Sequence, residues 1–158
     1  MTIQELLVQR DIKEILHFTT NRGITGMLAT GFLKSRNLLP NEARLEFVYQ
    51  YNCPDRSRDQ KWWDYINFSI TSVNRHLFGI SYGNWHAAED GWWCILSFTP
   101  EICTHDGVYF TTTNNMYSGV KRRQSYQGLA AMFASKIERW TNNIIERPLT
   151  LPNNQPTL

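Results

Sequence analysis

Several familiar site patterns are missing from this chain. It contains no GxGxxG, GxxxxGK or HExxH segment, and so carries no Rossmann fingerprint, phosphate-binding P-loop or zincin helix. No serine or cysteine stands in the strand–turn–helix context of a nucleophile elbow. The histidines do not have metal-ligand spacing (His17, His76, His86 and His105). We therefore expect no metal cofactor.

Cysteines and long apolar runs are also scarce. The chain has three cysteines and no CxxC, which argues against a zinc site and against a disulfide framework. We interpret them as reduced thiols of a cytoplasmic protein. No apolar run reaches the length of a membrane span, and the acidic residues near the N-terminus do not fit a signal peptide. The expectation is a cytoplasmic protein with no membrane partner.

The composition favours a folded domain that binds flat or apolar groups. Hydrophobic residues make up 42% of the 158 residues and aromatic residues 13%, with six tryptophans. This is enough apolar material for one domain with a core. The net charge of +2 permits a nucleic-acid partner without identifying one.

The first third of the chain carries clear secondary-structure signals. Thr2 and Glu5 form a capping-box pattern that predicts a helix over residues 3–10. Residues 15–20 are strand-prone. A second helix is expected to begin with Asn21 as its cap and to end at Gly31.

The rest of the chain predicts short strands and one long helix. Strands are expected where polar and apolar residues alternate or apolar runs are short, and a helix is expected where apolar residues recur at helical spacing. The expected strands are 44–51, 64–70, 76–82, 92–100 and 107–114, and the expected helix is 126–145. We predict a single α+β domain over residues 1–158.

His17 and Thr19 are two residues apart in the first predicted strand. Their side chains therefore point to the same face. Together they could donate to and accept from the hydroxyls of a ribose. The alternative is a structural histidine, which is the commoner role of a lone histidine at a strand end.

Residues 56–70, RSRDQKWWDYINFSI, combine arginines with aromatic rings. In an extended segment Arg56 and Arg58 would share a face, and two guanidinium groups suit a pyrophosphate or a nucleic-acid backbone. Trp62 and Trp63 could belong to the core or stack on a ring. Asn67 lies on the polar side of the expected strand and needs a partner if it is buried. The alternative is a solvated loop in which neighbouring aspartates pair with the arginines.

Residues 109–124 pass from a Thr/Asn-rich stretch into the basic run VKRR. Polar side chains, aromatic rings and consecutive cations suit single-stranded nucleic acid, which is bound by stacking and phosphate contacts. A solvated turn followed by a surface charge run is the alternative. The candidate nucleic-acid-binding residues are Asn114, Tyr117, Lys121, Arg122 and Arg123.

Four of these segments, in this order, resemble the DarT-type DNA ADP-ribosyltransferase toxins. They are residues 17–31, 56–70, 92–102 and 108–120, and the resemblance extends from about residue 12 to residue 134. It implies a split antiparallel ADP-ribosyltransferase sheet that holds NAD in a cleft. It also implies transfer of ADP-ribose to a base of single-stranded DNA, thymidine in several members. A macrodomain antitoxin of the DarG type, which removes the mark, is the implied partner.

The resemblance also implies roles for individual residues. His17 and Thr19 match the His-x-Thr that anchors the ribose and amide region of NAD, and Asn21 and Asn67 are the further cofactor residues. Asn67 matches the asparagine of the family's Tyr-(Val/Ile)-Asn strand. Asn114 matches the asparagine that ends a Thr-rich strand.

The catalytic-site arginine of the family matches one member of the RSR pair. Arg58 is favoured because it immediately precedes the aspartate and aromatic residues of the motif, and Arg56 is the other candidate.

The sequence departs from the family pattern at one place. The family's catalytic glutamate lies in a Gln-Ala-Glu-Val segment after a Pro-Thr lead-in. Here Pro156 and Thr157 supply the lead-in, but no Gln-Ala-Glu occurs, and we interpret Glu138 and Glu146 as surface charges of the last helix. We expect a domain that is incomplete at its C-terminus and inactive as given. The alternative function is a non-catalytic single-stranded nucleic-acid-binding domain or a degenerate NAD-binding fragment.

Overall fold

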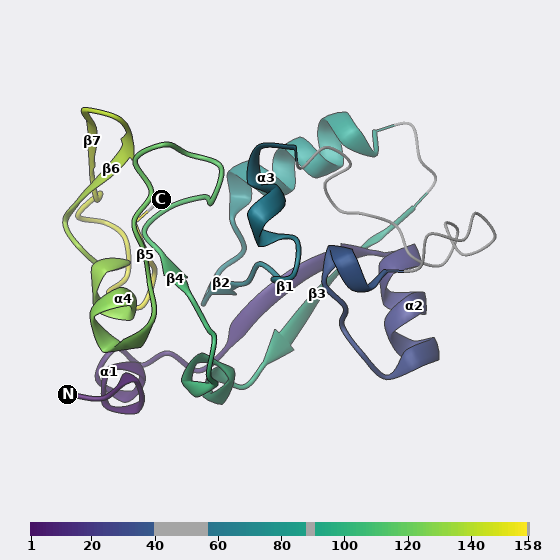
Figure 1. The fold of residues 1–158 in the computed structure, drawn as a ribbon, viewed down its shortest axis with the longest axis horizontal. Coiled ribbons are helices and arrows are strands. Elements are labelled where there is room, and N and C mark those ends of the chain that lie inside the picture. The colour runs from purple at the N-terminus through teal and green to yellow at the C-terminus, as the bar shows by residue number, and fades with distance from the viewer. Residues whose placement is uncertain (40–56, 88–90, 158) are drawn as a thin grey trace. The chain divides into compact units, whose positions relative to one another are not determined.

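The computed structural model describes residues 1–39, 57–87 and 91–157 (Figure 1). The strand expected at residues 44–51 and the side chain of Arg56 lie outside these ranges. The chain folds into two compact units. The first comprises Met1–Ile15, Ile70–Ser72 and Phe98–Leu158, and the second comprises Leu16–Ser69 and Val73–Ser97.

Most residues of a three-stranded sheet, in the order β2-β1-β3, belong to the second unit. Strand β1, Ile15–Thr20, lies in the middle, between β2, Ser69–Ile70, and β3, Trp93–Phe98. The central strand coincides with the prediction. Its middle position explains why five of its six residues are buried: Ile15, Leu16, Phe18, Thr19 and Thr20.

Helix α2, Asn21–Thr30, follows β1 without a loop. The cap is Thr20, whose hydroxyl accepts from the backbone N–H of Gly23 at 3.3 Å, so the prediction of Asn21 as the cap was wrong by one residue. The helix ends as predicted at Gly31, which has a φ of 73°. Glycine reaches this left-handed conformation without a side-chain penalty.

Helix α3, Arg75–Ile80, occupies residues predicted to be a strand. Its cap is Asn74, whose side chain accepts from the N–H of Leu77 at 3.0 Å, and the helix continues into a π-helical turn, Ser81–Trp85. A short apolar run fits a helix and a strand equally well. The asparagine cap is the local signal that decides for the helix here.

The predicted strand over residues 64–70 is reduced to β2. A 3-10 helix, Ser57–Trp62, precedes it and includes the backbone of Arg58. The rings of Trp62 and Tyr65 lie 5.1 Å apart, and the N–H of Tyr65 donates to Trp62 at 3.0 Å. These contacts hold the aromatic residues in a turn. The assumption of an extended segment at Arg58 was therefore wrong.

The first unit begins with α1, Ile3–Gln9, whose predicted capping box is present in full. The unit also contains two antiparallel hairpins. One pairs β4, Phe110–Thr111, with β5, Arg122–Arg123, and the other pairs β6, Lys136–Trp140, with β7, Asn143–Glu146. A 3-10 helix, Pro100–Thr104, and α4, Ser125–Ala131, complete the unit.

The long helix predicted over residues 126–145 is wrong beyond its first turns. The chain leaves α4 at Ala131 and returns as the β6–β7 hairpin. Asn142, with a φ of 62°, forms the tight connection between the strands, a conformation that asparagine tolerates better than most residues. The apolar spacing from Leu129 to Ile137 is real, but it continues from the helix into a buried position of β6.

Close packing between α4 and β5 depends on Gly128. A Cβ at this position would lie well inside 3.0 Å of the carbonyl oxygen of Arg123. The missing side chain lets the helix approach the backbone of the basic strand. The local sequence thereby fixes where Lys121, Arg122 and Arg123 stand relative to the core of the first unit.

Within the first unit, hydrogen bonds from side chains near both ends of the chain hold the C-terminal segment in place. Arg10 donates to the carbonyl oxygen of Asn153 at 2.7 Å, and its guanidinium lies 4.2 Å from the ring centre of Phe133. Arg147 donates to Pro152 and Gln155. The hydroxyl of Thr157 donates to Ala134 at 2.6 Å. Helices and separate antiparallel hairpins confirm the α+β fold class. The single domain over residues 1–158 stays a prediction.

Candidate functional site

His17 is held by a backbone carbonyl in the second unit. Its Nδ1 lies 2.9 Å from the carbonyl oxygen of Asn67. A carbonyl can only accept, so Nδ1 carries the proton and donates. Burial lowers the pKa of His17 from its ordinary 6.5, and the hydrogen bond to Asn67 opposes this only in part. The ring is therefore neutral at pH 7, and its Nε2 is an acceptor suited to a hydroxyl.

Thr19 lies on the same face of β1 as His17, as the strand alternation predicts. It is 4% exposed. A Cβ at Gly23 would fall well inside 3.0 Å of the Thr19 hydroxyl. The first turn of α2 can therefore sit over this hydroxyl only because residue 23 is glycine.

Gly23→Ala is expected to displace Thr19 and to lower the free energy of unfolding by about 1–3 kcal/mol, the usual cost of inserting a methyl group into a packed site. Gly79→Ala is the matched control, because a Cβ there meets nothing within 4 Å. Urea unfolding followed by circular dichroism measures both. Equal stability of the two variants would contradict the close approach of Gly23 to Thr19.

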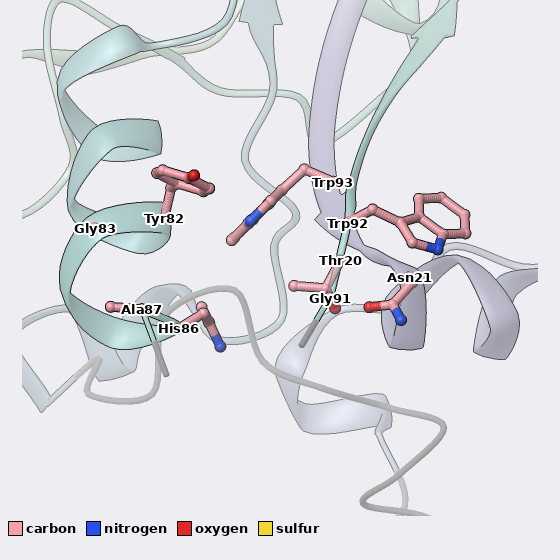
Figure 2. A pocket seen from close by; sticks show the side chains of 9 residues that line it. All are labelled: Thr20, Asn21, Tyr82, Gly83, His86, Ala87, Gly91, Trp92 and Trp93. Carbon is pink, nitrogen blue, oxygen red and sulfur yellow. The ribbon is translucent and has the colours of Figure 1, made fainter. Parts of the chain in front are cut away.

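A hollow of about 350 Å³ opens beside the end of β1 (Figure 2). Figure 2 shows the side chains of Thr20, Tyr82 and Trp93 directed into it, with Trp92 turned away. The N–H of Asn21 donates to Trp92 at 2.9 Å, which joins the start of α2 to the chain leading into β3. The described lining residues are Thr20, Asn21, Tyr82, Gly83, His86, Ala87, Gly91, Trp92 and Trp93.

The hollow and the His17 side chain lie on opposite faces of β1. Thr20 alternates with Thr19 along the strand, so it shares a face with Phe18. Phe18 packs edge-on against Phe78 at 5.2 Å and lies 5.8 Å from Trp93, which lines the hollow. Among the predicted cofactor residues, Asn21 lines the hollow, whereas His17, Thr19 and Asn67 are not among its lining residues.

The candidate nucleic-acid residues gather in the first unit, around β5. Lys121 and Arg123 are exposed. Arg122 is half-buried and donates to both the side chain and the backbone carbonyl of Asn115. Asn114 starts a tight turn and accepts from the N–H of Met116 at 3.1 Å. Lys121 and Arg123 are thus exposed to solvent, whereas Arg122 holds the preceding loop through Asn115.

Tyr117 does not present an open ring. It is 8% exposed, with Trp140 at 4.5 Å and the guanidinium of Arg139 at 4.4 Å from its ring centre. Arg139 also donates to the Tyr117 hydroxyl. Tyr117 therefore anchors its loop to the β6–β7 hairpin through these contacts. The more exposed rings of this unit are those of Tyr109 and Trp140.

The described ranges show no metal centre, and the thiol of Cys103 is buried. No group of three or more His, Cys, Asp or Glu residues could hold a metal ion within residues 1–39, 57–87 and 91–157. Burial raises the pKa of the Cys103 thiol to about 11, which makes it unreactive near neutral pH. In the same ranges, no helix has the length and apolar character needed to cross a membrane.

One comparison with known proteins decides the family. A sequence model described as DarT, ssDNA thymidine ADP-ribosyltransferase, matches residues 16–155. The chain belongs to the DarT family. A search of curated proteins finds no match.

The structure of this DarT-family chain brings only some of the predicted cofactor residues into contact with one another. His17 and Asn67 are in contact, but Asn67 takes part through its backbone, and its side chain is exposed. Arg58 is placed by its backbone alone, in the 3-10 helix. Trp63 lies under the guanidinium of Arg36 at 4.9 Å. The roles of these residues towards NAD stay predictions.

The aromatic lining of the hollow was not predicted from the sequence. Tyr82, His86 and Trp93 meet there because α3 and its π-helical turn bring residues 82–86 beside the start of β3. The available signal was Asn74, a residue type that favours the cap position of a helix. Interpreting the residues after it as a helix would have placed Tyr82 and His86 on one face.

Proposed function

We propose that this protein functions in the transfer of ADP-ribose from NAD to a base of single-stranded DNA, with thymidine as the base that the family description names, and that the 158 residues by themselves bind NAD and DNA without turnover. The match of the DarT family to residues 16–155 carries the proposal. ADP-ribosyltransferases use NAD as the donor of the group they transfer. The proposed cofactor residues lie in the second unit, and the proposed DNA residues lie in the first.

The NAD side of the proposal rests on β1. His17 is neutral, and its Nε2 can accept from a ribose hydroxyl, while Thr19 adds a hydroxyl on the same face. Asn21 and Asn67 supply amide groups at the two ends of this region. Arg58 is the proposed catalytic-site arginine, with Arg56 as the other candidate, because a guanidinium fork matches the oxygens of a pyrophosphate.

The DNA side of the proposal rests on β5 and the loop before it. Lys121 and Arg123 are exposed cations for phosphate groups, and Arg122 holds the loop through Asn115. Asn114 and Tyr117 shape the same loop. The helix beside these cations, α4, has only seven residues and carries no Lys or Arg, so an unpaired strand is a better fit than a recognition helix in a duplex groove.

In the cell, we propose that the protein is a toxin of the cytoplasm. A macrodomain antitoxin of the DarG type would remove the ADP-ribose mark from the DNA. This part of the proposal follows from the family alone. Co-expression of the active protein with such a macrodomain should restore growth, and continued growth arrest would argue against that pairing.

Binding measurements test the DNA side. Fluorescence anisotropy should show tighter binding to a single strand than to a duplex of the same sequence at the same salt concentration. Lys121→Ala combined with Arg123→Ala should weaken binding and lower the slope of log K against log[salt] by about 0.7 for each lost phosphate contact.

A double variant with the same change in charge is the control for this test. Lys13 and Lys136 are exposed cations of the same unit, paired with Asp11 at 3.4 Å and Glu146 at 2.8 Å. Lys13→Ala with Lys136→Ala should leave the salt slope unchanged. Equal slopes for the two double variants would remove β5 from the DNA site. Binding to DNA without any binding of NAD would favour the non-catalytic alternative.

Arg58→Ala is expected to weaken NAD binding by about 1.5–3 kcal/mol, the usual contribution of a hydrogen bond to a charged group. This corresponds to roughly a ten- to hundred-fold loss of affinity. Lys61→Ala removes a positive charge from the same 3-10 helix and is the matched control. Calorimetric titration with NAD compares the two. An unchanged affinity in Arg58→Ala would transfer the proposed role to Arg56.

A further inference from the structure

The hollow beside the end of β1 has the features of a binding site for one flat ring. Its volume of about 350 Å³ is near the lower limit of small-molecule pockets, which suits a single ring system better than a dinucleotide. None of its nine described lining residues is Asp, Glu, Lys or Arg. The described part of the lining is uncharged and rich in aromatic rings, which suits a planar ring system.

Tyr82 supplies a stacking surface in this hollow. Its ring lies nearly parallel to Phe78, with 6.4 Å between the centroids and 20° between the planes, yet Tyr82 is 62% exposed. Phe78 is itself fixed edge-on against Trp93 at 5.3 Å. One side of the Tyr82 ring therefore packs against Phe78, and the remaining ring surface is exposed to solvent and accessible to a ligand.

Polar groups at the rim can hydrogen-bond the edge of a ring. The amide oxygen of Asn21 would lie 3.0 Å from a Cβ at residue 91, so Gly91 leaves space for the Asn21 side chain at this point. The Thr20 hydroxyl already accepts from Gly23, and its proton remains able to donate. An amide and a hydroxyl beside aromatic rings match the donors and acceptors on the edge of a nucleobase.

We propose that this hollow binds one unpaired base of the single-stranded DNA, stacked on Tyr82, on the face of β1 opposite to His17 and Thr19. The inference rests on the proposed action on single-stranded DNA. It adds a contact to a base at a site that shares only Asn21 with the proposed NAD residues. The base held here positions the strand and is not the base placed against the His17 face.

The test compares two oligonucleotides that carry the same charge. Fluorescence anisotropy is measured with a short mixed-sequence single strand and with an abasic sugar-phosphate strand of equal length. The wild-type protein should prefer the strand with bases. Tyr82→Ala should reduce that preference by roughly 5- to 150-fold, the range found for losing one stacked base. Tyr82→Phe should retain it, because the ring is preserved.

A second pair of variants keeps the test valid if Tyr82→Ala fails to fold. A Cβ at Gly83 or at Gly79 meets nothing within 4 Å, but only Gly83 is among the lining residues. Gly83→Leu should fill the hollow and reduce the preference for bases. Gly79→Leu, one turn earlier in the helix, should leave it unchanged.

The outcomes separate this inference from the proposed function. If the wild-type protein binds the single strand and neither Tyr82→Ala nor Gly83→Leu changes its preference for bases, the inference is wrong and the proposed function stands. If these variants instead lose affinity for NAD in calorimetric titration, the hollow belongs to the cofactor and the inference is again wrong. If the wild-type protein binds NAD but no DNA, both the inference and the DNA side of the proposed function fail.

Discussion

Leu129→Ala is expected to lower the free energy of unfolding by about 2–5 kcal/mol, the usual cost of truncating a fully buried leucine. Leu129 lies in α4 and is 0% exposed. Its helix packs on α1, where Leu7 is 1% exposed. The closely packed Gly128 beside Leu129 limits how far the helix can move to close the cavity, so we expect a loss in the upper part of this range.

Leu28→Ala is the matched control. Leu28 also lies in a helix, α2, but is 79% exposed, and surface substitutions of this kind usually change stability by no more than about 0.5 kcal/mol. Urea unfolding followed by circular dichroism measures both variants. A loss for Leu129→Ala as small as that for Leu28→Ala would mean that α4 is not part of the core.

The elements predicted correctly are those whose signals are local. The capping box of Thr2 and Glu5 defines the start of α1, and Gly31 defines the end of α2. Both signals depend on hydrogen bonds or backbone angles within a few residues. The strand β1 was found because a β-prone segment lies directly between these two helices.

The failed predictions concern segments whose structure depends on distant contacts. Apolar residues at 77, 78 and 80 fit both a strand and a helix, and the packing of Phe78 against Phe18 and Trp93 accompanies the helix. Residues 132–145 keep a helical spacing by coincidence. There, Ile137 is buried in a hairpin strand and Asn142 makes the turn. Periodicity cannot distinguish these cases without knowledge of the neighbouring elements.

In the candidate site, too, features set by neighbouring residues could be predicted, and features set by distant contacts could not. Strand alternation alone predicted that His17 and Thr19 share a face. The partner of His17 is a backbone carbonyl, which every residue possesses, so no side-chain pattern could have identified it. The close approach of Gly23 to Thr19 was equally invisible, because a glycine in a helix has several possible reasons. The proposed DNA segment was chosen for its charge and stays a prediction, whereas the burial of Tyr117 depends on Arg139 and Trp140 from the following hairpin.

The 158 residues, incubated with NAD and a mixed-sequence single-stranded oligonucleotide, are expected to form no ADP-ribose adduct. The sequence contains no Gln-Ala-Glu segment, and a carboxylate is needed to stabilise the cationic sugar that develops as nicotinamide leaves. Electrostatic stabilisation of this kind is usually the largest single contribution to catalysis, so its absence should remove measurable turnover.

Glu138 and Glu146 were predicted to be surface charges, and their contacts agree with a structural role. They lie on the β6–β7 hairpin and not on the predicted helix. Glu138 accepts from the N–H of Asn142 at 3.1 Å, at the turn, and Glu146 pairs with Lys136 at 2.8 Å across the hairpin. Both carboxylates are thereby occupied in holding two strands together.

Mass spectrometry of the oligonucleotide decides the matter, with calorimetric titration of NAD on the same preparation as the control for a folded site. We expect NAD binding without an adduct. An adduct formed by the 158 residues themselves would contradict the prediction. Its loss in Glu138→Gln or in Glu146→Gln would then identify which hairpin carboxylate stabilises the sugar cation, because glutamine keeps the size of the side chain and removes only its charge.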